Sequence, residues 1–122
     1  AIEPDPARFA LLKENCQKWE TLSRNTIHTL NIAISARNSK NEPFYITNSP
    51  VSGFGVKYDL SNLEDELREA VVWQEIAVAS HKLDTLFKTI DPDFIKVATG
   101  GSELQVLQGA TRFYLSIPKN FS

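Results

Sequence analysis

Few residues that commonly carry catalysis occur in this chain, and their spacing indicates neither a nucleophile nor a metal site. Cys16 is the only cysteine, and the only histidines, His28 and His81, lie far apart. No serine or cysteine nucleophile motif accompanies either histidine, and zinc-ligand spacing is absent. We therefore interpret Cys16 as a core residue and both histidines as structural or surface residues.

The acidic side chains and one glycine-rich segment are the remaining candidates. The densest acidic run lacks the glycine-centred spacing of a calcium loop, which favours a solvated helix face and no metal site; it comprises Glu64, Asp65, Glu66 and Glu69. Glu3 stands before a helix signal, where its immediate neighbours favour a solvated carboxylate. The segment Ser52–Gly55 reads as an active-site loop or, as we favour, as a flexible connection.

Composition narrows the class of protein. The chain has 122 residues, which fits a single domain spanning residues 1–122, and its apolar share of 42% is enough for a globular core. The net charge of −2 and a pI near 5.7 predict no binding to nucleic acid. Apolar stretches are too short for a membrane helix, and no signal peptide is visible, so we expect a cytoplasmic protein without membrane contact.

The first half of the chain carries one strong helix signal and two strand signals. Asp5 is a typical N-cap and Pro6 a typical first helical residue, which predicts a helix to about Leu22. Its apolar face is formed by Phe9, Leu12, Cys16 and Trp19. Ala1–Glu3 resembles the end of a strand. Thr26–Ser35 and Pro43–Asn48 are predicted as an antiparallel pair around a turn at Asn38–Asn41.

The second half alternates strand and helix signals. Val71–Ala79 is predicted as a strand, and Asp84 as the cap of a short helix. Phe94–Ala98 is apolar enough for an interior strand of a parallel sheet. A tight turn at 99–101 and a Ser102–Gln105 capping box then open a helix that Gly109 ends, before a last strand at 115–117. The pattern predicts an α/β fold with a mostly parallel sheet and an antiparallel hairpin.

Several of these segments, in this order and at this separation, resemble the FkbM family of methyltransferases. They are Ala1-Ile2-Glu3-Pro4-Asp5-Pro6-Ala7-Arg8-Phe9, Asn31-Ile32-Ala33-Ile34-Ser35, Phe44-Tyr45-Ile46-Thr47-Asn48, Leu83-Asp84-Thr85-Leu86, and Pro92-Asp93-Phe94-Ile95-Lys96-Val97 with Gly101-Ser102-Glu103-Leu104. The resemblance implies a Rossmann-like methyltransferase fold that uses S-adenosylmethionine and methylates an oxygen or other heteroatom of a small-molecule or glycan acceptor.

The resemblance also implies where the cofactor binds. In this fold an acidic residue at the end of the second strand accepts hydrogen bonds from the ribose hydroxyls, and Glu3, followed by Pro4, occupies that position. Ala33 and Ser35 follow the third strand, in a loop that borders the adenine in the family; an ordinary strand end is an equally good interpretation of both. Lys96 also matches the family pattern. Its side chain is expected to face either the site or the solvent, and the sequence does not decide between them.

Two departures from the family pattern limit the expected activity. The family has Asp-Val-Glu-Gly where this chain has Ala98-Thr99-Gly100-Gly101, so two carboxylates near the methyl-transfer end are absent. The family's first strand and its glycine-rich turn also have no counterpart before Ala1, so we expect a truncated domain that self-associates through an open sheet edge. No catalytic residue can be assigned. The alternative is a non-catalytic interaction domain with a degenerate pocket.

Overall fold

The computed structural model describes residues 1–47, 56–57 and 72–115. The described residues form both helices and strands, which agrees with the α/β class, but these elements do not alternate: α1 (Pro6–Ser23), β1 (Ala33–Ile34), β2 (Ser39–Ile46), β3 (Val56–Lys57), β4 (Gln74–His81), α3 (Leu83–Leu86), α4 (Glu103–Gln108) and α5 (Thr111–Leu115). The segment 52–55, for which a loop was predicted, and the acidic run within 64–69 lie outside the described residues. Within the described ranges, no helix is long and apolar enough to cross a bilayer.

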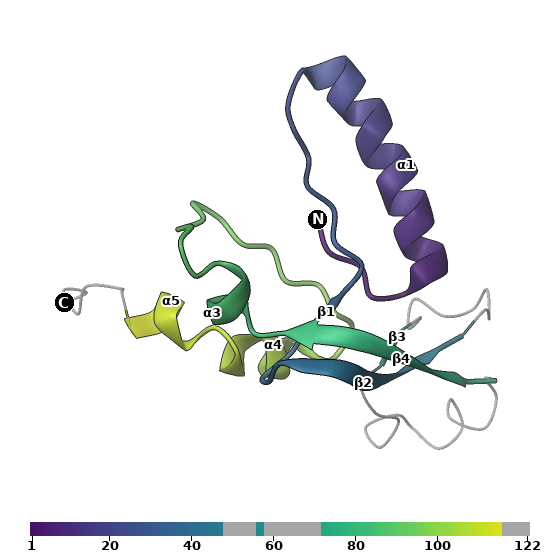
Figure 1. The fold of residues 1–122 in the computed structure, drawn as a ribbon, viewed down its shortest axis with the longest axis vertical. Coiled ribbons are helices and arrows are strands. Elements are labelled where there is room, and N and C mark those ends of the chain that lie inside the picture. Colours follow the sequence, from purple (N-terminus) through teal and green to yellow (C-terminus); the bar gives the residue numbers. More distant parts are fainter. Residues whose placement is uncertain (48–55, 58–71, 116–122) are drawn as a thin grey trace.

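The strands form one mixed sheet in the order β1-β4-β2-β3 (Figure 1). β1 pairs with β4 in parallel, through Ala33 with Ser80 and Ile34 with His81. β2 pairs antiparallel with both β4 and β3. The prediction of a mostly parallel sheet is therefore wrong for the part of the chain that the structure describes.

The predicted hairpin between Thr26–Ser35 and Pro43–Asn48 is also wrong, because β4 lies between β1 and β2. β2 begins at Ser39, inside the segment predicted as a turn. The Asn38 side chain explains this path, since its Oδ1 accepts the Lys82 N–H at 2.9 Å and its Nδ2 donates to Thr85 Oγ1 at 3.1 Å. These bonds tie the start of β2 to the end of β4.

Helix α1 begins where the sequence predicts. Asp5 Oδ1 accepts the N–H groups of Ala7 at 2.8 Å and Arg8 at 3.4 Å, and a proline follows the cap. Cys16 is buried, in agreement with its interpretation as a core residue. Trp19, however, is 63% exposed, because the second half of α1 projects from the sheet (Figure 1). Trp19 lies on the predicted apolar face, but that part of the face is not buried.

The chain end before α1 pairs with the segment that follows it. Ile2 forms a parallel bridge with Leu30, in which Leu30 N–H donates to Ala1 O at 3.0 Å and Glu3 N–H donates to Leu30 O at 3.1 Å. The strand predicted at Thr26–Ser35 is thus reduced to this bridge and the short β1. The pairing agrees with the prediction that Ala1–Glu3 is the end of a strand.

Two small apolar clusters lie in the described core, one within the sheet and one between the sheet and the C-terminal helices. Ala33, Phe44 and Val78 form one cluster, with Ile76 packed against it. The other contains the buried side chains of α3, α4 and the residue before α5, which are Leu83, Val106 and Ala110. Val78 and Ile76 lie two residues apart and share a face of β4.

Asp84 has a different role from the predicted one. Lys82 occupies the cap position of α3. Asp84 instead accepts hydrogen bonds at the start of α5, from Thr111 Oγ1 at 2.8 Å and the Arg112 N–H at 3.0 Å. It therefore joins α3 to α5. Leu115 ends that helix, so the strand predicted to begin there is wrong at this residue.

The largest correction concerns Phe94–Ala98, which was predicted as an interior strand. It is not a strand, Phe94 is 82% exposed, and its backbone makes no hydrogen bond to another described residue. An apolar run forms a strand only when neighbouring backbones satisfy its N–H and C=O groups. On the side that faces Ala1–Pro4, the described part of the chain leaves a pocket instead.

Candidate functional site

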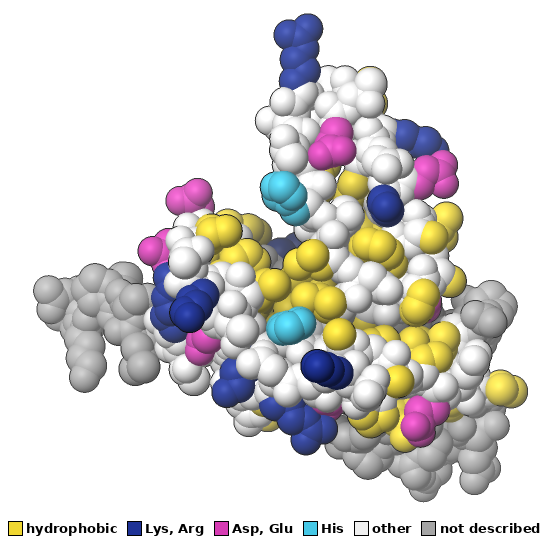
Figure 2. All heavy atoms as spheres, viewed as in Figure 1, with side chains coloured by type: hydrophobic (Ala, Val, Ile, Leu, Met, Phe, Trp, Pro, Cys, Tyr) yellow, Lys and Arg dark blue, Asp and Glu magenta, His cyan; other side chains and the backbone are white. Residues whose placement is uncertain are grey.

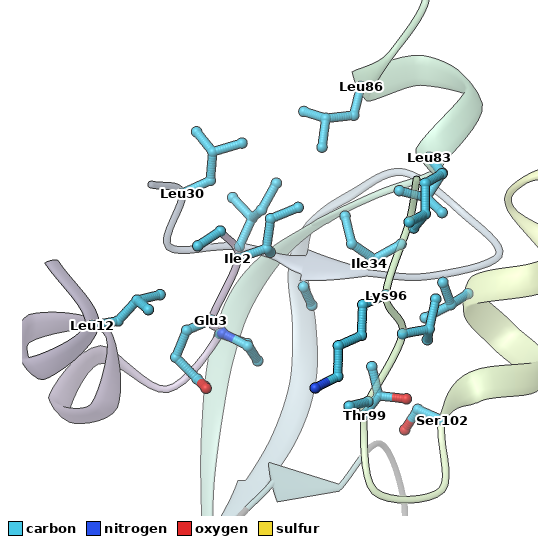
Figure 3. Close-up of a pocket in the computed structure, with 18 of the residues that line it drawn as sticks. Ile2, Glu3, Leu12, Leu30, Ile34, Leu83, Leu86, Lys96, Thr99 and Ser102 are labelled. Carbon is cyan, nitrogen blue, oxygen red and sulfur yellow. The ribbon is translucent and has the colours of Figure 1, made fainter. Parts of the chain in front are cut away.

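The candidate site is a pocket of about 970 Å³ between the N-terminal segment and the segment Pro92–Gly100. Its walls are mostly apolar and include Ile2, Leu12, Leu30, Ile34, Leu83 and Leu86 (Figure 3). Figure 2 shows apolar side chains gathered in the hollow between α1 and the α3 region. Ligand sites usually combine such apolar walls with a few polar groups, so the polar residues of the wall decide what binds.

Glu3 is the polar residue that the local fold holds most firmly. Its backbone is paired with Leu30, and Asn31 Nδ2 donates to Glu3 O at 2.8 Å and to Pro4 O at 3.1 Å. The capped start of α1 follows at once. These contacts fix the backbone on both sides of the carboxylate, which lies at the end of a parallel bridge, where α/β sheets commonly bind ligands.

The Glu3 carboxylate is a hydrogen-bond acceptor that is partly shielded from water. Its Oε1 accepts the Asp5 N–H at 2.9 Å. Burial raises the pKa of Glu3 above its ordinary value, opposed by the Asp5 hydrogen bond and by the nearby charge of Arg8. Arg8 is itself engaged by Asp5, with 3.5 Å between Arg8 Nε and Asp5 Oδ2. The carboxylate therefore remains able to accept donors from a ligand.

The structure brings three of the four predicted cofactor residues to this pocket. Glu3, Pro4 and Ala33 line it. Ser35 does not line it: it is buried, its N–H donates to His81 O at 3.0 Å, and its carbonyl faces Gly109. Ser35 thus connects β1, β4 and the end of α4, and it lies outside the pocket wall.

A glycine turn forms the opposite rim of the pocket, as the sequence predicts. Gly100 has φ 63° and Gly101 has φ 115°, both in the region that favours glycine. The Glu103 carboxylate holds the turn, accepting the N–H groups of Thr99 at 3.0 Å and Gly101 at 2.9 Å. Hydrogen bonding to its own N–H and to this turn lowers the pKa of Glu103.

The capping box predicted at the start of α4 is wrong. The Ser102 side chain makes no capping hydrogen bond, although Ser102 occupies the cap position. Glu103 meets the turn N–H groups in its place. The spacing of the two glycines before a glutamate was the signal that could have revealed it.

Glu3 and the turn 99–102 share one pocket, as expected for segments that end in a common crevice (Figure 3). Ala98 and Gly100 line it at the positions where the family pattern has carboxylates. Among the described lining side chains, Glu3 supplies the carboxylate, and Arg8, His28 and Lys96 supply the ionisable nitrogens. The described ranges contain no cluster of His, Cys, Asp and Glu that could hold a metal ion.

Sequence reasoning missed two kinds of lining residue. Arg8 and Leu12 reach the pocket from the first turns of α1, one helical turn apart, and His28 reaches it from the irregular segment after α1. The helical spacing of Arg8 and Leu12 was visible in the sequence. Nothing local indicated His28, because its position depends on the bridge between Ile2 and Leu30.

An α/β chain with a carboxylate at the end of a parallel pairing and a glycine turn across an apolar pocket is compatible with a nucleoside-binding enzyme domain. The family model of the methyltransferase FkbM domain matches residues 1–119. The chain therefore belongs to the FkbM methyltransferase family. Comparison with curated proteins and with solved structures found no match.

Proposed function

We propose that the pocket binds S-adenosylmethionine and that Glu3 accepts the hydrogen bonds of its ribose hydroxyls. The observation that carries this proposal is the position of the Glu3 carboxylate, half-buried in an apolar pocket of about 970 Å³ at the end of a parallel pairing. A vicinal diol offers two donors, and a carboxylate is an acceptor with room for both. Family membership supports a methyl donor of this class.

The pocket fits such a cofactor in size and chemistry. Its volume lies at the upper end of the roughly 300–1,000 Å³ that is usual for small-molecule sites. Leu12, Leu30 and Ile32 offer apolar surface for a purine base, and Ala33 leaves room beside the backbone. The Rossmann-like arrangement belongs to the same proposal. It is supported by the parallel pairing of Ile2 with Leu30 and of β1 with β4.

When bound, the donor supplies a methyl group activated on a sulfonium. The residues of this chain then contribute positioning and exclusion of water, which account for much of the barrier lowering in such transfers. The acceptor is an oxygen or other heteroatom of a small molecule or glycan. Ala98 and Gly100 offer no side-chain base at the rim, so an acceptor that needs proton removal gains nothing from these positions.

Calorimetric titration with S-adenosylhomocysteine, the demethylated donor, tests the proposal. We expect saturable binding by the wild type and about a tenfold loss in Glu3→Gln, which keeps the shape and removes the charged acceptor. Glu75→Gln is the matched control, since Glu75 is an exposed carboxylate in β4 outside the lining residues. Absence of binding at millimolar ligand would refute cofactor binding and favour a non-catalytic interaction domain.

A further inference from the structure

Lys96 is the cation of the pocket that the proposed ribose site does not use. It lies within the run Pro92–Ala98, most of which lines the pocket, and its side chain extends into the pocket toward the side that carries Glu3 (Figure 3). Of the two orientations that the sequence left open, the structure has the one that faces the site. The lysine therefore points at whatever occupies the pocket.

No carboxylate of the described residues forms an ion pair with Lys96. Glu3, the carboxylate in the described wall, accepts the Asp5 N–H, and Arg8 is the cation whose charge acts on it. The residues beside Lys96 in sequence, Ile95 and Val97, are apolar and also line the pocket. Lys96 is itself exposed, so its ammonium group is open to water and to any ligand that enters the pocket. A ligand that brings both a negative charge and hydrogen-bond acceptors is the partner that suits this group best.

The balance of charge in the wall favours an anion as that partner. The described ionisable side chains of the wall comprise Arg8, His28 and Lys96 on the basic side, and Glu3 on the acidic side. Arg8 is already engaged by Asp5. His28 and Lys96 are therefore the basic side chains left for a ligand, and Lys96 lies on the segment across the pocket from the one that carries Glu3.

We propose that Lys96 binds a carboxylate of the ligand whose ribose hydroxyls meet Glu3, or of the acceptor beside it. This inference rests on the proposed function and deepens it, since it gives the pocket one end for a neutral diol and one for an anion. The carboxylate has two sources, the amino-acid part of the methyl donor and a carboxylate-bearing acceptor. Lys96 acts as a positioning residue in both cases, because a fixed charge orients the ligand.

The test compares three probes on the wild type, Lys96→Gln and Lys96→Arg. S-adenosylhomocysteine carries the amino-acid carboxylate, 5′-methylthioadenosine lacks it, and acetate reports on a separate carboxylate site when titrated into protein saturated with 5′-methylthioadenosine. Lys88→Gln is the matched control, because Lys88 is exposed and lies outside the lining residues. The readout is affinity by calorimetry, at low and high salt.

A donor carboxylate predicts about a tenfold loss for S-adenosylhomocysteine in Lys96→Gln, unchanged affinity for 5′-methylthioadenosine, and partial rescue in Lys96→Arg. An acceptor carboxylate predicts acetate binding that Lys96→Gln abolishes, while both nucleosides bind as in the wild type. Equal affinities of wild type and Lys96→Gln for all three probes overturn the inference and leave the ribose site intact. A wild type that binds neither nucleoside refutes the proposed function itself.

Discussion

Gly109, between α4 and α5, is the position where the smallest substitution has the largest predicted cost. A Cβ added there would lie 2.2 Å from the Ser35 carbonyl oxygen and 3.3 Å from Lys82 Cα. An ordinary carbon–oxygen contact is about 3.3 Å, so the backbones must separate by about 1 Å. Both neighbours are main chain, and no side-chain rotation relieves the contact. Gly109→Ala must therefore move α4 away from the sheet.

The magnitude follows from what this movement disturbs. Overpacking of this kind costs about 1–3 kcal/mol. The displaced Ser35 also donates its N–H to His81 O at 3.0 Å, a bond whose loss adds about 1 kcal/mol. We expect Gly109→Ala to lower the free energy of unfolding by about 2–4 kcal/mol, measured by urea denaturation followed by circular dichroism. Because small domains have only about 5–15 kcal/mol in total, this loss is large.

Gln108→Ala is the control, because Gln108 is the exposed last residue of α4. Its free energy of unfolding is expected to stay within about 0.5 kcal/mol of the wild type. If Gly109→Ala is as stable as Gln108→Ala, α4 does not pack against Ser35 as the structure shows, and the reasoning fails.

Five further predictions concern charge, stability, assembly and activity. Affinity for S-adenosylhomocysteine should fall as pH drops through the raised pKa of Glu3, because protonation removes the acceptor, and calorimetry across pH should show a flatter profile in Glu3→Gln. The same raised pKa has a stability consequence. Protonated Glu3 favours the folded state, so its contribution is fully present below the unfolded pKa and is lost as pH rises through the folded value; the measured unfolding free energy of Glu3→Gln should lack this component. Arg37→Ala should destabilise the chain by about 1–2 kcal/mol in urea, since Glu42, 6% exposed in its side chain, loses its two-bond partner, whereas Lys40→Ala should not. Light scattering at high micromolar concentration should show self-association. The reason is that the N–H and C=O groups of Ile2, which point away from Leu30, and those of Phe94–Ala98 make no hydrogen bond to a described residue. A stable monomer contradicts this prediction. Purified protein should transfer little or no methyl group from labelled S-adenosylmethionine, given Ala98 and Gly100, and robust turnover with any acceptor contradicts this.

Local signals in the sequence were sufficient where a structure depends on neighbours in the chain. Asp5 and Pro6 predict the start of α1 because a cap acts within one helical turn. Gly100 and Gly101 predict a turn because their backbone conformation excludes most other residues. The run Val71–Ala79 predicts a strand, and β4 covers most of it, because strand character is also visible over a few neighbouring residues.

Predictions failed where the outcome depends on a distant partner. The apolar run Phe94–Ala98 has the composition of a buried strand, but its backbone pairs with no described residue, and composition carries no information about that pairing. Trp19 has the spacing of a core residue, yet α1 extends beyond the sheet at that point. β2 pairs with β4 and not with β1, because Asn38 is bonded to Lys82, a contact distant in sequence.

The residues of the candidate site also fall into those that the sequence could predict and those that it could not. Glu3 and Pro4 were predicted from a strand end before a capped helix together with the family resemblance, and the structure places both in the pocket. Ser35 was predicted from the same resemblance but is directed to Gly109. The inward direction of Lys96 could not be chosen from sequence, since both faces of an apolar segment were open to it.

The most direct test of the account maps the amide signals of the uniformly ¹⁵N-labelled chain during titration with S-adenosylhomocysteine. The account predicts saturable shifts that cluster at the amides of the pocket wall, Ile2, Glu3, Leu30, Thr99 and Gly100, and that are much weaker in Glu3→Gln. Amides of the exposed end of α1 should not respond. An unchanged spectrum at millimolar ligand, or shifts confined to residues outside the pocket wall, would contradict the claim that this pocket binds the methyl donor.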